Sequence, residues 1–114
     1  MRIERSKIYL ANLNPPFKTE PGKIRPVVVV QSNLINGHHP STLICPITSK
    51  VKKDIRIMRI HIPKQDSGLH FDSDILVDQA RAIDNSRLIK KVGSIPFHQM
   101  EKLNNSLKIL LELD

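Results

Sequence analysis

Five polar residues that could act on a phosphodiester form a set at or near the predicted loops. They are Glu20, Arg25, Thr48, Ser49 and Gln79. An arginine beside a phosphate stabilises negative charge as it develops on the non-bridging oxygens, and a threonine hydroxyl can donate a hydrogen bond to the same oxygens. If the substrate is RNA, its own 2′-hydroxyl can be the nucleophile, so the protein need not supply one. These residues are therefore candidates for metal-free phosphodiester chemistry.

Arg25 and Thr48 are the residues on which this chemistry depends most. Arg25 stands where a loop meets four consecutive β-branched residues, Val27 to Val30, and such a run is typical of a strand buried on both faces. Functional sites often consist of polar groups that lie at the end of a rigid strand. The simpler alternatives are a surface ion pair between Arg25 and Glu20, and a Thr48 hydroxyl that only caps its own backbone.

The sequence leaves open which group would transfer protons. Arginine is a poor base because its pKa lies above about 12, so Glu20 or a histidine would have to serve instead. The histidines show no metal-ligand spacing such as HExxH; they are His38, His39, His61, His70 and His98. The sequence also contains no phosphate-binding glycine motif and no nucleophile elbow. We therefore expect no metal and no cofactor.

The chain carries a net charge of +7, from 18 Lys and Arg against 11 Asp and Glu. A basic domain of this size favours a polyanionic partner, either a nucleic acid or an acidic protein segment. Lysines in predicted loops are candidate phosphate contacts, namely Lys18, Lys23, Lys50, Lys52 and Lys53. Aromatic residues are few, with no Trp, one Tyr and three Phe, so extensive base stacking is not expected.

The length of 114 residues predicts a single domain over residues 1–114. One cysteine, Cys45, cannot form an intramolecular disulfide, which indicates a reducing compartment. No apolar run approaches the roughly 20 residues of a membrane span, and the charged N-terminus is not followed by a signal core. We expect a cytoplasmic protein with no membrane partner.

Apolar and alternating patterns predict five or six short strands, mostly antiparallel. They cover residues 8–13, 25–31, 41–48 with an interruption at Pro46, 56–62, 74–83 and 88–95. The last is expected at a sheet edge because paired lysines suit an edge. From Phe97 to Leu111 the apolar residues are spaced by three and four, which predicts an amphipathic helix. The expected fold is mainly β with a C-terminal helix, a small barrel or half-barrel.

Five motifs follow one another along the chain. They are Ile8-Tyr9-Leu10 with Asn14-Pro15, Arg25-Pro26-Val27-Val28-Val29, Pro46-Ile47-Thr48-Ser49-Lys50, Asp78-Gln79-Ala80-Arg81-Ala82-Ile83-Asp84, and Arg87-Leu88-Ile89 with Gly93. In this order and spacing the motifs resemble the MazF/PemK family of toxins. The resemblance covers about residue 7 to residue 112, which is nearly the whole chain.

The resemblance implies an SH3-like barrel of the MazF/PemK/CcdB type in a homodimer that cuts single-stranded RNA, mainly mRNA, at short specific sequences without a metal. Cleavage by the 2′-hydroxyl would leave a 2′,3′-cyclic phosphate and a 5′-hydroxyl. The family's essential Arg and Thr fall on Arg25 and Thr48, its loop acid falls on Glu20, and Gln79 would lie near the RNA groove. An antitoxin with an acidic, flexible C-terminal segment would block that groove.

Two departures from the family pattern and two alternative functions stand beside this reading. Ser6-Lys7 replaces a common Gly-Asp, and the loop over residues 14–24 differs from the common Gly-Ser-Glu-Gln version, so RNA contacts are expected to differ there.

One alternative is a gyrase-poisoning toxin of the CcdB family, although this chain lacks the Trp-Gly-Ile terminus of that family. The other is an inactive relative that only binds nucleic acid or antitoxin.

Overall fold

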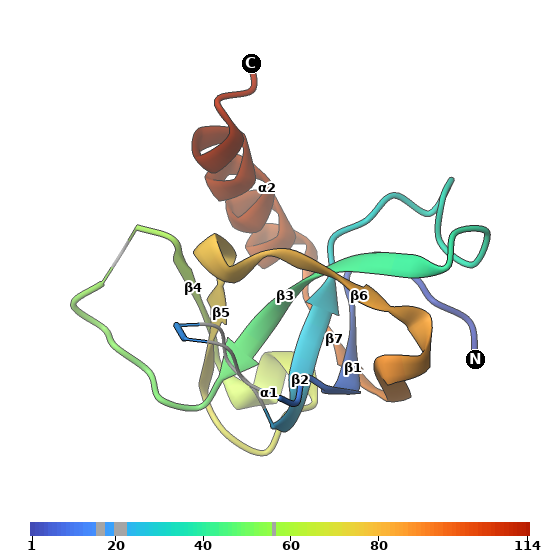
Figure 1. The fold of residues 1–114 in the computed structure, drawn as a ribbon. Helices are drawn as coiled ribbons and strands as arrows, with labels where there is room; N and C mark the ends of the chain where they lie inside the picture. The colour runs from blue at the N-terminus through green and yellow to red at the C-terminus, as the bar shows by residue number, and fades with distance from the viewer. Residues whose placement is uncertain (16–17, 20–22, 56) are drawn as a thin grey trace.

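The computed structural model describes residues 1–15, 18–19, 23–55 and 57–114 (Figure 1). Its strands are β1 (Lys7–Asn12), β2 (Ile24–Val29), β3 (Ser41–Thr48), β4 (Arg59–Ile62), β5 (Ser73–Leu76), β6 (Arg81–Asp84) and β7 (Leu88–Ser94). Its helices are the short α1 (Lys64–Ser67) and the long α2 (Phe97–Leu111), and 3₁₀ turns cover Val77–Gln79 and Asn85–Arg87. The prediction of a mainly β fold with a C-terminal helix is confirmed.

The described strands form a seven-stranded sheet in the order β4-β5-β3-β2-β1-β7, with β6 paired to β3 outside this path. Every ladder is antiparallel. No ladder joins β4 to β7 among the residues described, so the sheet is curved but open. β7 lies at one edge, as its paired lysines predicted.

β2 lies between β1 and β3 and contributes to two hydrophobic cores. Val28 packs in one core, which also contains Met100 and Leu103 of α2. Val27 and Val29 pack in the other. Because successive side chains of a strand point to opposite faces, a strand with a core on each side is apolar at every position. The prediction of a strand buried on both faces is confirmed.

The predicted strand over residues 74–83 is wrong, because the chain turns in its middle. β5 pairs with the end of β3 through Ile47 and Ile75, while β6 pairs with its beginning through Ile44 and Arg81. Ile44 and Ile47 are three residues apart along β3, whereas their partners Arg81 and Ile75 are six residues apart. The three additional residues form the 3₁₀ turn over Val77–Gln79, so the predicted alternation across this segment does not hold.

Pro46 does not interrupt β3, contrary to the prediction. It pairs with Val27 of β2 on one side. On the other side it falls between the stretches of β3 that pair with β6 and with β5. The N–H donor that proline lacks is therefore not needed by the ladder at this point.

Two further elements differ in extent from the sequence prediction. Of the strand expected over residues 56–62, residue 56 lies outside the described residues, and β4 begins at Arg59 because Met58 has a left-handed φ of 65°. The segment between the strands predicted over residues 56–62 and 74–83 contains α1, which ends at Gly68, whose φ is 86°. Gly93 of β7 allows α1 to lie close, because a Cβ there would overlap the carbonyl oxygen of Ser67.

α2 packs on the sheet with its N-terminal half, where Met100 and Leu103 are buried. Figure 1 shows its C-terminal half projecting beyond the sheet. Leu110 and Leu111 are accordingly exposed, although they belong to the predicted apolar face. No helix in the described part of the chain combines the length and the apolar character needed to cross a membrane.

Candidate functional site

A groove of ≈ 810 Å³ lies where the start of β2 meets the end of β3. Parts of β1 and β7 and the loop between α1 and β5 complete its walls. Five cationic side chains line it, namely Lys23, Arg25, Lys50, Lys90 and Lys91. Within the described residues no Asp or Glu is part of this lining, so the groove presents a positive surface suited to a polyanion.

Strand register brings Arg25 and Thr48 together. β2 and β3 are antiparallel, with Val27 opposite Pro46. Continuing this register by two residues sets Arg25 opposite Thr48, and both side chains line the groove. Directly opposed residues on antiparallel strands have Cβ atoms about 5 Å apart, so one phosphate can contact both side chains. The two residues that the sequence singled out therefore share one site.

The Thr48 hydroxyl is oriented by the backbone that follows it. The Lys50 amide donates a hydrogen bond to Thr48 Oγ1 at 3.1 Å, which closes a turn around Ser49. This is the local capping bond expected of a threonine at a strand end. Because Oγ1 accepts in this bond, the hydroxyl proton is left to donate elsewhere. Capping and donation to a phosphate are thus compatible.

A buried carboxylate holds the basic loop after β3. Asp74 is opposite Thr48 in the β3–β5 ladder and is only 2% exposed. Its oxygens accept from the Lys52 amide at 3.0 Å and from Arg59 Nη1 at 3.0 Å, and they contact His61 Nδ1 at 3.2 Å. Arg59 Nη1 also donates to the Lys50 carbonyl at 3.1 Å. The position of the loop is therefore fixed relative to Thr48.

The loop over residues 14–23 is fixed at its base. The Leu13 amide donates to the Lys23 carbonyl at 2.8 Å, and the Lys23 amide donates to Asn14 Oδ1 at 2.7 Å. Arg87 Nη1 donates to the carbonyls of Asn12 and Asn14 at 2.9 and 2.7 Å. These bonds align Lys23 with β2 and the groove. Glu20, the predicted loop acid, lies outside the described residues.

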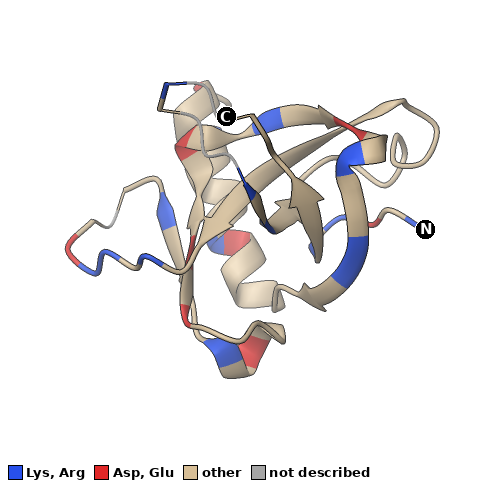
Figure 2. Ribbon diagram, turned by 60° about the horizontal axis from the view of Figure 1, so that its bottom comes forward, with Lys and Arg blue, Asp and Glu red and all other residues tan. Residues whose placement is uncertain are grey.

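The structure divides the remaining candidates between two places. Ser49, Lys50 and Lys23 line the groove with Arg25 and Thr48. Lys52 and Lys53 line a separate cavity of ≈ 620 Å³ beside Asp74 and α2. Lys18 and Gln79 are not among the described lining residues of either cavity. Figure 2 shows the blue Lys and Arg positions along the loop between β3 and β4 and on several strands.

A family model confirms the resemblance seen in the sequence. The model described as PemK-like, MazF-like toxin of type II toxin-antitoxin system matches residues 4–111. The chain belongs to this family.

Two curated relatives of the toxin family match the chain almost from end to end. Endoribonuclease EndoA of Bacillus subtilis is 33% identical over 113 residues, which are 99% of this chain and 97% of that protein. Endoribonuclease MazF of Staphylococcus saprophyticus is 34% identical over 111 residues, 97% of this chain and 92% of that protein.

Solved structures agree on the fold. MazF (Form-I) from Deinococcus radiodurans matches with a TM-score of 0.85 at 23% identity, and 99% of each chain is covered. The MazE-MazF complex (Form-II) from the same organism contains a chain that matches with a TM-score of 0.81 at 20% identity, covering 100% of this chain and 99% of that one. The predicted MazF/PemK-type fold is therefore confirmed.

Several of the residues that line the groove were not predicted as site residues from the sequence. His70 and Phe71 line it from the loop between α1 and β5, and Lys90 and Lys91 line it from β7. The lysine pair was noticed only as a sign of an edge strand. Loop residues such as His70 and Phe71 have no periodicity, so no sequence pattern indicated that they would face Arg25.

Proposed function

We propose that this toxin is a sequence-specific endoribonuclease that cuts single-stranded RNA, above all mRNA, in the cytoplasm and without a metal ion. The observation that carries the proposal is that Arg25 and Thr48 line one cationic groove, on neighbouring strands whose continued register would set them opposite one another. Membership of the MazF-like toxin family supports it, since two relatives are named endoribonucleases.

The proposed reaction is an attack by the RNA on itself. The 2′-hydroxyl oxygen forms a bond to the adjacent phosphorus while its proton passes to a base, and the bond from phosphorus to the 5′-oxygen breaks. The leaving 5′-oxygen takes up a proton, so the products are a 2′,3′-cyclic phosphate and a 5′-hydroxyl. Arg25 and Thr48 stabilise the charge on the non-bridging oxygens of the pentacoordinate state.

The proton transfers of this reaction have three candidate groups. Glu20 is the carboxylate candidate, and Arg25 is the second candidate for a role in the proton shuttle. Of the described histidines, His70 lines the groove. An imidazole can act as a general acid, so this side chain is a candidate to protonate the leaving oxygen. Lys23, Lys50 and Ser49 then hold flanking phosphates and sugars from the groove wall, while Lys18, Lys52, Lys53 and Gln79 contact the strand beyond it.

Two protein partners complete the proposal. The first is a cognate antitoxin, whose acidic, flexible C-terminal segment occupies the cationic groove and excludes RNA. The second is another copy of this chain, because α2 exposes apolar side chains beyond the sheet. Isolated exposed apolar residues are ordinary, but a cluster at one end of a helix is typical of an interface.

The deciding experiment incubates purified protein with a long single-stranded RNA in EDTA and sequences the fragment ends. We expect cuts at one short motif with 5′-hydroxyl ends. Arg25→Ala should fold normally by circular dichroism and lose at least about 100-fold in rate, because a preorganised charge-stabilising donor contributes that much. Arg2→Ala, an exposed arginine outside the groove, is the matched control and should cut like the unmodified protein.

Three results would contradict parts of this proposal. Strict dependence on an added divalent ion would overturn the metal-free mechanism. Normal cleavage by a folded Arg25→Ala protein would remove Arg25 from the site. Intact RNA after incubation with folded, antitoxin-free protein would favour an inactive relative or a gyrase-binding toxin.

A further inference from the structure

We propose that Phe71 is a nucleobase-binding residue, whose ring stacks on a base of the RNA strand that lies in the groove. The inference rests on the proposed function and adds a subsite to it. Neither the motifs nor the candidate residues of the sequence include Phe71, and it is not part of the charge-stabilising pair.

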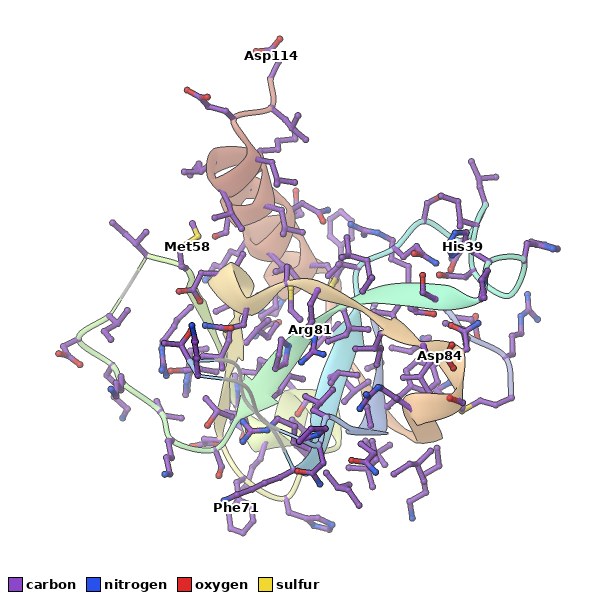
Figure 3. The ribbon with its side chains drawn as sticks, viewed as in Figure 1. His39, Met58, Phe71, Arg81, Asp84 and Asp114 are labelled. Atoms are coloured by element: carbon purple, nitrogen blue, oxygen red, sulfur yellow. The ribbon has the colours of Figure 1, made fainter. Side chains whose placement is uncertain are left out.

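The position of Phe71 in the groove is the first observation. Its side chain lines the same cavity as Arg25 and Thr48, yet it is 68% exposed. Figure 3 shows it at the lower edge of the molecule, pointing away from the ribbon. Among the other described aromatic residues, Tyr9 is fully buried and Phe97 lies on α2 outside the groove lining. Phe71 is therefore the described aromatic ring that an RNA base in the groove could reach.

The rigidity of the loop that carries Phe71 is the second observation. Ser73 Oγ donates to the Phe71 carbonyl at 2.9 Å, and the Lys64 amide donates to Asp72 Oδ1 at 2.9 Å. On the other side of Phe71, Leu69 packs against the hydrophobic core. Flanking contacts thus hold the backbone while the ring stays outside. A backbone that is held in place before binding loses little conformational freedom when a base stacks on the ring that it carries.

The charges around Phe71 complete the chemistry of the subsite. Lys50, Lys90 and Lys91 line the same groove and can contact the phosphates of a single strand. Single-stranded nucleic acids are commonly bound by this combination of a cationic groove with an aromatic platform. Every base has a π-face, so stacking tolerates any sequence. Phe71 should therefore contribute to affinity for RNA, while other residues select the cleaved sequence.

A fluorescence experiment tests the contact directly. The chain contains no Trp, so Phe71→Trp introduces a single indole reporter. In the non-cleaving Arg25→Ala background, a single-stranded RNA carrying the cleaved motif should quench this emission, and the quenching should saturate with the same midpoint as binding measured by fluorescence anisotropy of labelled RNA. Phe97→Trp, at an exposed phenylalanine of α2 outside the groove lining, is the matched control and should not be quenched.

Kinetics provide the second test. Phe71→Ala should raise KM for RNA by about fivefold to a hundredfold, the range expected for loss of one base–aromatic stack. The value of kcat and the sequence of the cut site should not change. Phe71→Tyr should restore KM, because its ring can stack equally well, whereas Phe71→Leu should not restore it. A residue that only maintained the loop would be rescued by leucine as well as by tyrosine.

The outcomes separate this inference from the function on which it rests. Cleavage with unchanged KM in Phe71→Ala, or RNA binding without quenching in Phe71→Trp, would overturn the stacking subsite and leave the endoribonuclease intact. Loss of binding to an acidic antitoxin peptide with unchanged RNA kinetics would assign Phe71 to the protein partner and also overturn it. Absence of both RNA binding and cleavage in the unmodified protein would overturn the proposed function and the subsite together.

Discussion

At the scale of single residues, the structural role of the Thr48 hydroxyl can be separated from its catalytic role. It accepts a hydrogen bond from the Lys50 amide, so its removal affects the loop as well as any bound phosphate. Thr48→Val keeps the shape of the side chain and removes only the hydroxyl. We expect kcat to fall by about 100- to 1000-fold, as for other single charge-stabilising donors. Single-turnover cleavage of a labelled RNA measures the loss.

The matched variant for this prediction is Thr48→Ser, which keeps the hydroxyl and loses a methyl group. It should retain most of the cleavage rate. Thermal unfolding of both variants checks the structural contribution, since one lost hydrogen bond costs about 1 kcal/mol. If Thr48→Val were less stable but cut RNA at the normal rate, the hydroxyl would serve only to cap the strand.

Cys45 differs from Thr48 because the fold makes its thiol unreactive. Burial, and then the nearby Asp78 carboxylate, raise the pKa of its thiol to about 12. Only the thiolate reacts with disulfide reagents, and at pH 8 it would be about one part in ten thousand. We expect Cys45 to be unreactive towards Ellman's reagent in the folded protein and to react fully in guanidinium chloride. Rapid labelling of the native protein would contradict this burial.

At the scale of elements, Asp74 joins β5 to the loop that carries Lys50. Removal of its carboxylate leaves the Lys52 amide without its acceptor and the largely buried Arg59 guanidinium without its anionic partner. Asp74→Ala should therefore lower the free energy of unfolding by about 2 to 4 kcal/mol. Urea unfolding measures the change. The KM for RNA should also rise, because the loop would no longer be held beside Thr48.

Asp54→Ala is the control for this prediction, because Asp54 is an exposed carboxylate in the same loop. Exposed substitutions of this kind change stability by about 0.5 kcal/mol or less. Equal unfolding curves for the two variants would show that Asp74 does not fix the loop. Asp74→Asn should fall between them, since the amide oxygen still accepts a hydrogen bond.

The sequence predicted those elements whose periodicity is local. The run from Val27 to Val30 indicated a strand between two cores, and the spacing from Phe97 onwards indicated α2. The turn over Val77–Gln79 could not be found in this way. The segment carries no Gly or Pro that would mark a turn. The turn follows from the change of partner along β3, from Ile44 with Arg81 to Ile47 with Ile75. Which part of β3 a segment pairs with is decided by residues far away in the sequence, so local periodicity does not show it.

The same distinction applies to the site. Arg25 and Thr48 were found because each stands at the end of a recognisable strand, and antiparallel register then sets them opposite one another. Asp74 was the first residue of a predicted strand, and nothing local showed that it would bind the loop after β3. Phe71 lies in a loop, where composition gives no indication of what the side chain faces.

At the scale of the whole molecule, the cationic groove and the apolar end of α2 lie on different parts of the fold. Cationic side chains gather in the groove formed by β2, β3 and β7. Exposed apolar side chains gather at the end of α2 and just beyond it, namely Ile109, Leu110, Leu111 and Leu113. A polyanion and an apolar partner can therefore bind the same molecule at once.

The apolar end of α2 leads to a prediction about assembly. We expect the protein to be a homodimer in which this end is covered, because each of its four apolar side chains is at least 42% exposed in one copy. Leu111→Asp should raise the dimer dissociation constant by at least about tenfold, since an interface residue that matters costs more than 1 kcal/mol when lost. Sedimentation equilibrium measures the constant. Leu34→Asp, at a 90% exposed leucine in the loop before β3, is the matched control and should remain dimeric. A Leu111→Asp protein that dimerises like the control would place the interface on another face of the molecule.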